Sequence, residues 1–298
     1  MKKQKMKTTL DDKIYYFVIN AILTALLVSV LYPLVYVVSA SFSNGQAILQ
    51  ARVFLWPVDL SLEGYELVFG YSFIRIGYIN SFIYTISATI LSVFFTMVAA
   101  YALARKNLPF RNFFMFIFTF TMFFSGGMIP NFLLMRQLGL LNTRMVMIIP
   151  GLISVYNLIV ARTFVSTSLP NDLLEASQMD GCSNTRYFFQ IVMPLSKAVI
   201  AVMVLWYGVG NWNSYFPALI YLTDRNLHPL QMFLRQILIM NTMAMSEFGD
   251  PDLLERMRGT IEVLKYSVIV VGSLPVIVLY PFIQKYFAQG VMIGSIKG

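Results

Sequence analysis

Six long apolar stretches constrain this chain more than any other feature of its sequence. Each is close to or longer than the ~20 residues that a helix needs to cross the hydrocarbon core of a bilayer, and charged residues are almost absent from their middles. Backbone amides in lipid must be hydrogen-bonded within the segment, so each stretch is predicted to be helical. The expected fold class is all-α, a polytopic transmembrane bundle of six spans. The predicted spans are residues 14–41, 78–104, 113–130, 145–165, 198–222 and 263–287.

The composition argues against a soluble fold. Hydrophobic residues make up 58% of the 298 residues and charged residues only 12%, against roughly 25% charged residues in soluble domains. A net charge of +8 would make nucleic acid a candidate partner of a soluble protein, but we expect a lipid bilayer and no nucleic acid here. One cysteine and one histidine allow no internal disulfide and no histidine-rich metal site. No catalytic and no metal-binding residues are predicted.

The first apolar stretch could be a cleaved signal peptide or a retained helix. Lysines at positions 2, 3, 5 and 7 resemble the basic start of a signal peptide, and Val38-Ser39-Ala40 resembles a cleavage site. The stretch is much longer than the about 7–15 apolar residues of a signal peptide, however. This length favours a retained helix over residues 14–41, preceded by a cytoplasmic N-terminus over residues 1–13.

Charge placement predicts which side of the membrane each loop faces. Six crossings put both termini on one side. With the N-terminus inside, the inner segments carry 13 basic and 5 acidic residues, which leaves 9 of each for the outer segments. Basic residues accumulate in cytoplasmic loops, so both termini are predicted to be cytoplasmic. In the second long outer loop, the apolar residues 230–240 are too few to cross and are expected to form an interfacial or partly buried helix, while His228 is expected to be solvated.

The loop between the fourth and fifth spans has the pattern of two short helices joined by an elbow. Pro170 suits a first helical turn, Asp172 favours the positive end of that helix, and Gly181 suits a left-handed stop. Ser183 can cap the next helix. A short face of modest size, which could lie in a groove of another protein, is formed by Leu173, Leu174, Ala176 and Ser177.

This segment resembles the EAA loop of ABC importer permeases, usually written E-A-A, three residues, G, nine residues and I-x-L-P. The chain has Glu175-Ala176-Ser177, three residues, Gly181, nine residues and Ile191-Val192-Met193-Pro194. Serine replaces the second alanine and methionine replaces the leucine, while the spacing is kept. The resemblance implies a coupling loop over residues 169–194 that a separate ATPase grips. The residues that it assigns to ATPase coupling are Leu173, Leu174, Glu175, Ala176, Ser177, Asp180, Gly181, Ile191 and Pro194.

Residues 212–217 and 284–298 look like the corresponding parts of carbohydrate permeases of the maltose-importer type. By this resemblance the chain is similar to the second permease subunit of that class. It implies a permease core over residues 74–287, an added first helix, and a cytoplasmic tail over residues 288–298 that reaches the ATPase; a frayed basic terminus is the plainer interpretation of the tail. The likeness to the subgroup that imports complex or uronic oligosaccharides is looser.

The resemblance also implies the partners. They are a second homologous permease subunit, a cytoplasmic ATPase dimer, an external solute-binding protein, and a sugar or oligosaccharide as substrate. No glycine is followed by lysine anywhere in the chain, so it has no P-loop. We therefore expect no enzyme activity and no cofactor bound by this chain, with ATP and Mg²⁺ held by the partner ATPase subunits.

Polar and aromatic residues in the fifth span are candidates for the substrate pathway. Amides can bond sugar hydroxyls and flat rings can cover the apolar faces of a pyranose, whereas polar residues within spans also hold helices together. The candidates are Asn211, Trp212, Asn213 and Tyr215, with Tyr156 and Asn157 of the fourth span as weaker ones.

Two other functions compete with an ATP-driven permease. A secondary transporter would be expected to carry ionisable residues within its spans for ion coupling, and the middles of these spans lack them. An integral membrane enzyme acting on glycan or lipid would want paired carboxylates or a metal cluster at the membrane surface. The cytoplasmic acids Asp172, Glu175 and Asp180 fit the coupling motif instead.

Overall fold

The computed structural model describes residues 10–244 and 251–294, and every regular element among them is helical. This agrees with the predicted all-α class. The elements of the first half are α1 (Leu10–Ser41), α2 (Gly45–Leu49), α3 (Glu63–Gly70), α4 (Ile74–Ala104), α5 (Arg111–Phe123), α6 (Met128–Gln137) and η1 (Arg144–Met147). Those of the second half are α7 (Val155–Ser168), α8 (Asn171–Met179), α9 (Asn184–Tyr187), η2 (Phe188–Val192), α10 (Met193–Leu195), α11 (Lys197–Trp212), α12 (Phe216–Tyr221), η3 (Arg225–Leu227), α13 (Leu230–Ala244) and α14 (Pro251–Gly294).

Three helices are long and apolar enough to cross a membrane unbroken. They are α1, α4 and the Met257–Pro281 part of α14, which correspond to the predicted first, second and sixth spans. Two further pairs of helices pass the same test only together, because each pair is bent sharply at a short break. The predicted class, an all-α membrane protein, was therefore right. The prediction that the third, fourth and fifth spans are each one continuous helix was wrong.

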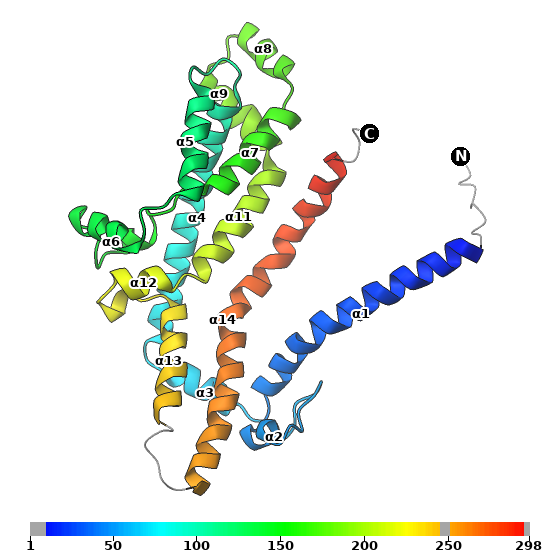
Figure 1. Cartoon of the computed structure of the whole chain (residues 1–298), viewed down its shortest axis with the longest axis vertical. Coiled ribbons are helices and arrows are strands. Elements are labelled where there is room, and N and C mark those ends of the chain that lie inside the picture. The colour runs from blue at the N-terminus through cyan, green and yellow to red at the C-terminus, as the bar shows by residue number, and fades with distance from the viewer. Residues whose placement is uncertain (1–9, 245–250, 295–298) are drawn as a thin grey trace. The chain divides into compact units, whose positions relative to one another are not determined.

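The predicted span over residues 113–130 is broken near its end. Helix α5 ends at Phe123, and α6 continues at 115° to it, so α6 runs away from the axis of α5 (Figure 1). Gly127 adopts a left-handed backbone with φ +87°, and its amide donates to Ser125 Oγ rather than into a helix. Hydrophobicity extends through this turn, but the helix does not.

The predicted span over residues 145–165 contains only one regular helix, and that helix starts late. Residues 144–147 form a 3₁₀ turn, and α7 begins at Val155 and runs for 14 residues. Pro150 lacks an amide hydrogen, and Gly151 is left-handed with φ +79°. These two residues explain why no continuous helix crosses the segment.

The predicted span over residues 198–222 is divided as well. Helix α11 ends at Trp212, and the short α12 starts at Phe216 with Pro217 in its first turn. In an uninterrupted helix the ring of Pro217 would clash with the carbonyl group four residues earlier, so the chain restarts there. A second bend, of 80°, separates Asn184–Leu195 from α11.

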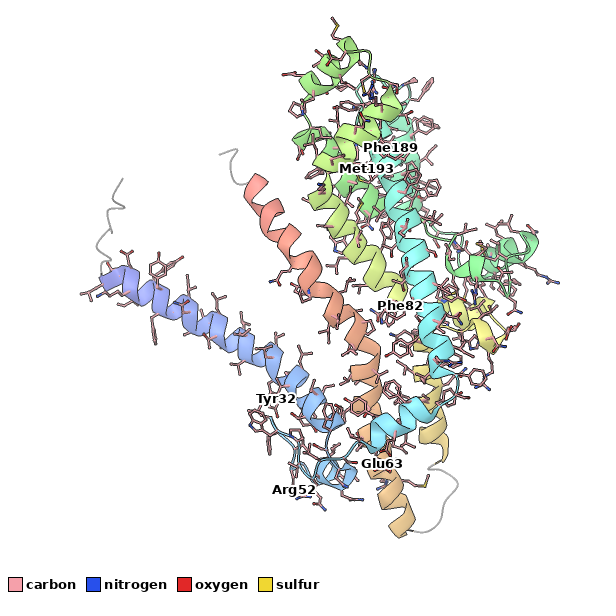
Figure 2. All side chains as sticks on the ribbon, turned by 180° about the vertical axis from the view of Figure 1, so that it is seen from behind. Tyr32, Arg52, Glu63, Phe82, Phe189 and Met193 are labelled. Carbon is pink, nitrogen blue, oxygen red and sulfur yellow. The ribbon has the colours of Figure 1, made fainter. Side chains whose placement is uncertain are left out.

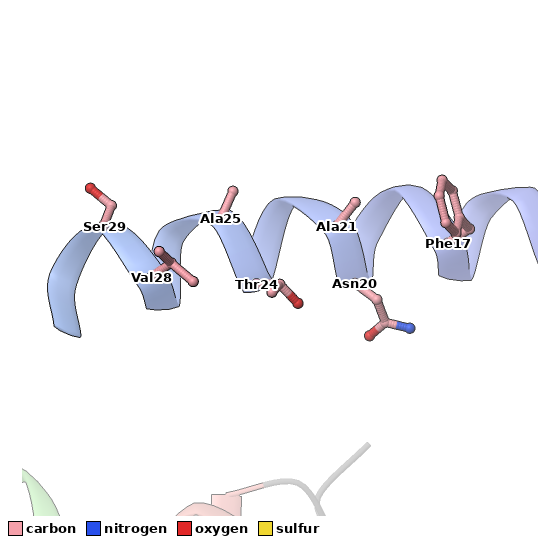
Figure 3. A pocket seen from close by; sticks show the side chains of 7 residues that line it. All are labelled: Phe17, Asn20, Ala21, Thr24, Ala25, Val28 and Ser29. Carbon is pink, nitrogen blue, oxygen red and sulfur yellow. The ribbon is translucent and has the colours of Figure 1, made fainter. Parts of the chain in front are cut away.

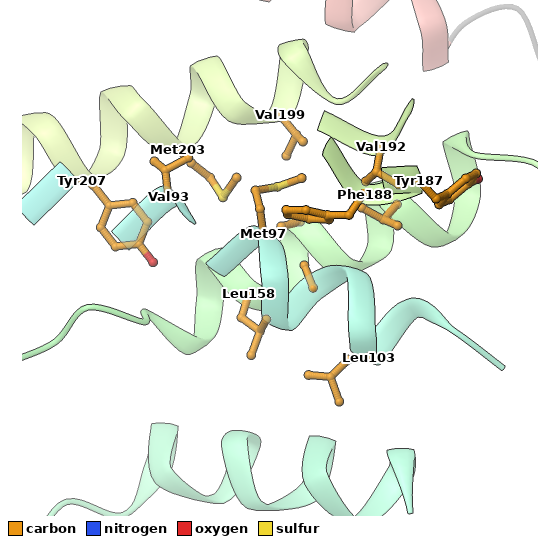
Figure 4. Close-up of a cluster of buried hydrophobic side chains, with 13 residues drawn as sticks. Val93, Met97, Leu103, Leu158, Tyr187, Phe188, Val192, Val199, Met203 and Tyr207 are labelled. Carbon is orange, nitrogen blue, oxygen red and sulfur yellow. The ribbon is translucent and has the colours of Figure 1, made fainter. Parts of the chain in front are cut away.

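The helices fall into two compact units, each described by itself. Of the described residues, one unit contains 72–236 and 273–294, the other 10–71, 237–244 and 251–272. In the larger unit α4 packs along both α7 and α11 (Figure 1). Methionine and leucine side chains from the three helices, Met97, Leu158 and Met203, interdigitate in a fully buried cluster (Figure 4). Close packing of this kind, rather than exclusion of water, holds membrane helices together.

The smaller unit joins the end of α1 to α2, α3 and the first part of α14. Tyr36 and Tyr266 meet edge to face at 5.6 Å between ring centroids. Gly45 of α2 and Gly259 of α14 approach so closely that a side chain on Gly45 would overlap the Gly259 backbone. This contact explains why both positions are glycine.

The segment before α13 is fastened to the start of α4. Asn80 Nδ2 donates to the carbonyl oxygens of Asn226 (2.7 Å) and His228 (3.1 Å), and Tyr84 Oη donates to Leu227 O (2.8 Å). His228 is therefore only 5% exposed, and the expectation that it is solvated was wrong. Leu230 and the ring of Phe233 are fully buried, which confirms the expectation of a partly buried helix in this segment.

Candidate coupling loop and substrate pathway

The predicted elbow is formed by a regular helix C-terminus. The amide of Cys182 donates to Ser177 O (2.9 Å) and that of Gly181 to Gln178 O (3.0 Å), the pair of bonds that defines a Schellman motif. Gly181 has φ +71°, as its predicted left-handed stop requires. Ser183 Oγ accepts from the amide of Arg186, which confirms the predicted cap of the next helix.

The two sides of α8 face different surroundings. Ser177 is buried, its hydroxyl donates to Leu174 O (2.7 Å), and Leu174 packs against the main core. Leu173 remains 42% exposed and Met179 89% exposed, and Glu175, Ala176 and Asp180 are exposed as well. The four-residue face predicted from the sequence is thus divided. Leu173, Ala176 and Met179 form the apolar surface that is open to a partner, and Met179 had not been predicted.

The second half of the loop is anchored in the bundle. Tyr187, Phe188 and Val192 insert between α4, α7 and α11 and are buried in the same cluster as Met97 and Met203 (Figure 4). Ile191 is half-buried and packs against this cluster. This half of the loop is therefore packed directly against the spanning helices.

A turn of π-helix lies between the elbow and α11. Residues Phe188–Val192 form this turn, and Pro194 follows in the first turn of α10. The exposed Phe189 stacks on Phe94 of α4 at 6.5 Å between ring centroids, and Figure 2 shows Phe189 and Met193 at the same end of the bundle. Turns of π-helix are uncommon and occur frequently at functional sites.

A basic cleft of about 520 Å³ lies between α8 and the loop that follows α4. Arg105, Arg111 and Arg162 line it, with Glu175 as the one acidic residue. Arg105 Nη1 donates to Asn184 Oδ1 (2.6 Å) at the start of α9, and Arg162 Nε donates to Leu103 O (3.3 Å). No ion pair joins these arginines to a carboxylate among the residues that the structure describes. The bond from Arg105 to Asn184 joins the loop after α4 to the start of α9, and the lining of the cleft carries a net positive charge.

Two of the candidate pathway residues are engaged in helix packing. Trp212 is buried, with its ring centroid 5.2 Å from that of Phe82 and 6.2 Å from that of Tyr78. Asn157 is also buried. Their positions favour the alternative role, in which polar residues within spans hold helices together.

The other candidates remain accessible. Tyr156 is exposed and packs its ring 5.4 Å from that of Trp206. Tyr215 is exposed beneath Arg235, whose Cζ lies 5.6 Å from the ring centroid. Asn211 is half-buried and Asn213 is exposed. Trp206 and Arg235, which contact these two rings, were not among the predicted residues, because the sequence does not show which side chains meet a given ring.

A shallow hollow also runs along one face of α1, lined by residues of that helix alone: Phe17, Asn20, Ala21, Thr24, Ala25, Val28 and Ser29 (Figure 3). Small side chains on a spanning helix permit the close approach of another helix. The hollow contains none of the predicted site residues.

Comparison with known proteins identifies the family. Residues 92–293 match the model of the binding-protein-dependent transport system inner membrane component, and this match covers more than half of the chain. The chain belongs to that family. It is a permease subunit of an ABC importer, and its apolar helices place it in the membrane.

Individual proteins resemble this permease over most of its length. It is 39% identical to protein LplC of Bacillus subtilis over 89% of each chain. It is 38% identical to the polygalacturonan/rhamnogalacturonan transport system permease protein YtcP of the same organism, over 98% of this chain and all of that protein. A chain in the crystal structure of a bacterial ABC transporter involved in the import of the acidic polysaccharide alginate has 32% identity and a TM-score of 0.81, over 95% of this chain and all of that one.

Proposed function

We propose that this permease imports an oligosaccharide that carries acidic sugar units. Its partners would be a second homologous permease, an external solute-binding protein and a cytoplasmic ATPase dimer that supplies ATP and Mg²⁺ binding. The chain itself would hold no cofactor and would form half of the pathway, with both termini in the cytoplasm. The observation that carries the ATP-driven part of this proposal is the coupling loop, because an exposed helix here continues into a segment that is buried among the spans.

The geometry supports a lever that links the ATPase to the pathway. Leu173, Ala176 and Met179 are exposed on α8, whereas Tyr187 and Val192 are buried among the spans. A partner that moves α8 on nucleotide binding would shift α11 as well, because the Schellman turn and the π turn connect them with no long loop. ATP and cargo would then change the populations of two states through their different affinities for each.

The cargo is inferred from relatives and from one side-chain pair. Relatives are named for transport of polygalacturonan and rhamnogalacturonan, and of arabinooligosaccharides, and the similar crystal structure concerns alginate. Arg235 contacts the exposed ring of Tyr215 and pairs with no carboxylate in the described part of the chain. An aromatic face beside a guanidinium suits a sugar ring that bears a carboxylate.

Reconstitution of the complete transporter in proteoliposomes tests the proposal. Uptake of an oligogalacturonide should require the binding protein and ATP and should stop when ATP is replaced by a non-hydrolysable analogue. Uptake driven by an ion gradient without ATP would instead establish a secondary transporter. Conversion of a glycan or lipid by the isolated chain would establish the membrane enzyme.

A matched pair of variants tests the acidic cargo. Arg235→Gln should reduce uptake of an oligogalacturonide while a neutral oligosaccharide of the same length is affected little, and Arg235→Lys should retain most of the uptake because it keeps the charge. Equal losses for acidic and neutral cargo in Arg235→Gln would refute a role of this charge in selecting the cargo.

A further inference from the structure

A short loop after α1 exposes its apolar side chains although it is held rigidly. Residues 53–58 have the sequence Val-Phe-Leu-Trp-Pro-Val and contain no charged residue. Phe54 is 63% exposed, Leu55 49% and Trp56 80%. Neighbouring large apolar side chains of this kind are rarely left open to water and usually mark an interaction surface. We call residues 53–58 the aromatic loop.

Backbone and side-chain hydrogen bonds fix the aromatic loop to the end of α1. Ser39 Oγ donates to Leu55 O (2.6 Å). The amide of Val58 donates to Ser43 Oγ (3.0 Å), and Val58 O accepts from the amide of Asn44 (3.1 Å). At the start of the loop, Val53 is buried against Ala40, Ala47 and Val263. The exposed rings are therefore held in place by the fold and do not hang from a loose segment.

An ion pair closes the base of the loop. Arg52 Nη2 lies 2.8 Å from Asp59 Oδ2, and both side chains are exposed; Figure 2 shows Arg52 at the loop beyond the end of α1. The charges thus flank the apolar tip without entering it. A polar base and an apolar, aromatic tip are the arrangement that suits a boundary between water and lipid.

The length of α1 places this loop at such a boundary. From Lys13, the last charged residue before the apolar stretch, to Ser39 the helix rises roughly 39 Å at about 1.5 Å per residue. A bilayer is ~40–45 Å thick with its headgroups. If Lys13 lies among the headgroups of one leaflet, Ser39 and the hydrogen-bonded Leu55 lie among those of the other.

We propose that the aromatic loop inserts Phe54, Leu55 and Trp56 into the headgroup and upper acyl region of the bilayer leaflet opposite Lys13, and so fixes the depth of α1. The indole N–H of Trp56 can bond to headgroup oxygens while its ring meets the acyl chains. The proposal requires only that α1 crosses the membrane. It depends neither on the cargo nor on which side of the membrane the N-terminus occupies.

Tryptophan fluorescence of the complete transporter in lipid vesicles tests this placement. The difference in emission between the native chain and Trp56→Phe isolates Trp56 from the other two tryptophans. We expect this signal to be largely lost with lipids brominated close to the glycerol backbone and less affected by lipids brominated at the chain ends. Acrylamide in the aqueous phase should quench it less than it quenches a free tryptophan derivative. The same measurement with Trp206→Phe serves as a matched control for a tryptophan in a spanning helix.

Two results would overturn the proposal. Strong quenching by acrylamide together with no effect of either brominated lipid would place Trp56 in water. Insensitivity to both reagents, or a loss of lipid quenching when the solute-binding protein is added, would show that a protein covers the loop.

Discussion

The elbow at Gly181 offers the sharpest test of the coupling loop. A Cβ at this position would meet no atom within 4 Å, so substitution introduces no collision. The whole penalty comes from the left-handed backbone, φ +71°, which disfavours residues with a side chain by roughly 1–2 kcal/mol. In a Gly181→Val variant the free loop can relax into another turn, and docking on the ATPase must restore the strained one. Affinity for the ATPase should then fall by about 5–30-fold, the factor that 1–2 kcal/mol represents.

Gly181→Asn is the matched control, because asparagine tolerates the left-handed conformation better than valine does. The assay is titration of the purified ATPase onto the permease pair in detergent micelles, with membrane insertion checked for each variant. Valine should weaken binding clearly more than asparagine. Equal binding by all three proteins, or equal loss in both variants, would refute the argument that the elbow must keep this turn in the docked state.

Three further changes test the rest of the fold through thermal unfolding in detergent. Gly45→Ala should destabilise the protein by about 1–3 kcal/mol, as overpacking does, and more than Gly259→Ala, whose Cβ would lie 3.1 Å from the Gly45 carbonyl carbon; the reverse order would contradict the contact. Thr96→Val removes the 2.8 Å bond to Tyr207 and should lose about 0.6–1.7 kcal/mol, the range from average to largest for bonds between membrane helices, whereas Tyr207→Phe should lose more because it also removes the 2.9 Å bond that the amide of Ser154 donates to Tyr207 Oη; equal losses in the two variants would show that the bond from Ser154 contributes nothing. Burial lowers the pKa of His228 below 6.5, so the unfolded chain binds this proton more readily and stability should be lost as the pH falls from 6.5 towards the lowered value. His228→Asn should show a smaller loss over the same pH range, and an unchanged pH profile would refute this assignment.

The sequence was most informative where local chemistry decides the structure. Apolar length alone located α1 and α4, because lipid leaves the backbone no alternative to a helix. The elbow followed from Gly181 and Ser183, whose conformational and capping preferences act within a few residues. Such features can be predicted without knowing what packs against them.

The errors arose where an apolar stretch of sequence continues although the helix ends or changes direction. Hydropathy along residues 113–130 is continuously apolar and so predicts one helix. Gly126-Gly127, however, allows the chain to turn by 115°. The Pro150-Gly151 pair and Pro217 were comparable signals, and treating them as breaks would have improved the predicted boundaries.

Local sequence patterns could not predict the burial of residues whose contacts lie far away along the chain. His228 is covered because Asn80, 148 residues earlier, bonds to its carbonyl oxygen. The division of the α8 face arises in the same way, since Leu174 meets a core assembled from three other helices. For the pathway candidates, the sequence identified suitable residue types, but only the packing separated the enclosed Trp212 from the accessible Tyr215.

The break between α5 and α6 has a consequence for the assembled transporter. Helix α5 has 13 residues and rises only about 20 Å, less than the ~30 Å of the hydrocarbon core. The turn that follows therefore lies at a depth where lipid offers no hydrogen bonds. Phe124 and Gly127 donate their amides to Phe120 O and Ser125 Oγ, whereas the amides of Ser125 and Gly126 have no partner among the described residues. Every residue from Phe123 to Pro130 is exposed in the single chain. Water inside a channel, or a neighbouring subunit, has to supply hydrogen bonds to this turn. The isolated permease therefore leaves these peptide groups unsatisfied.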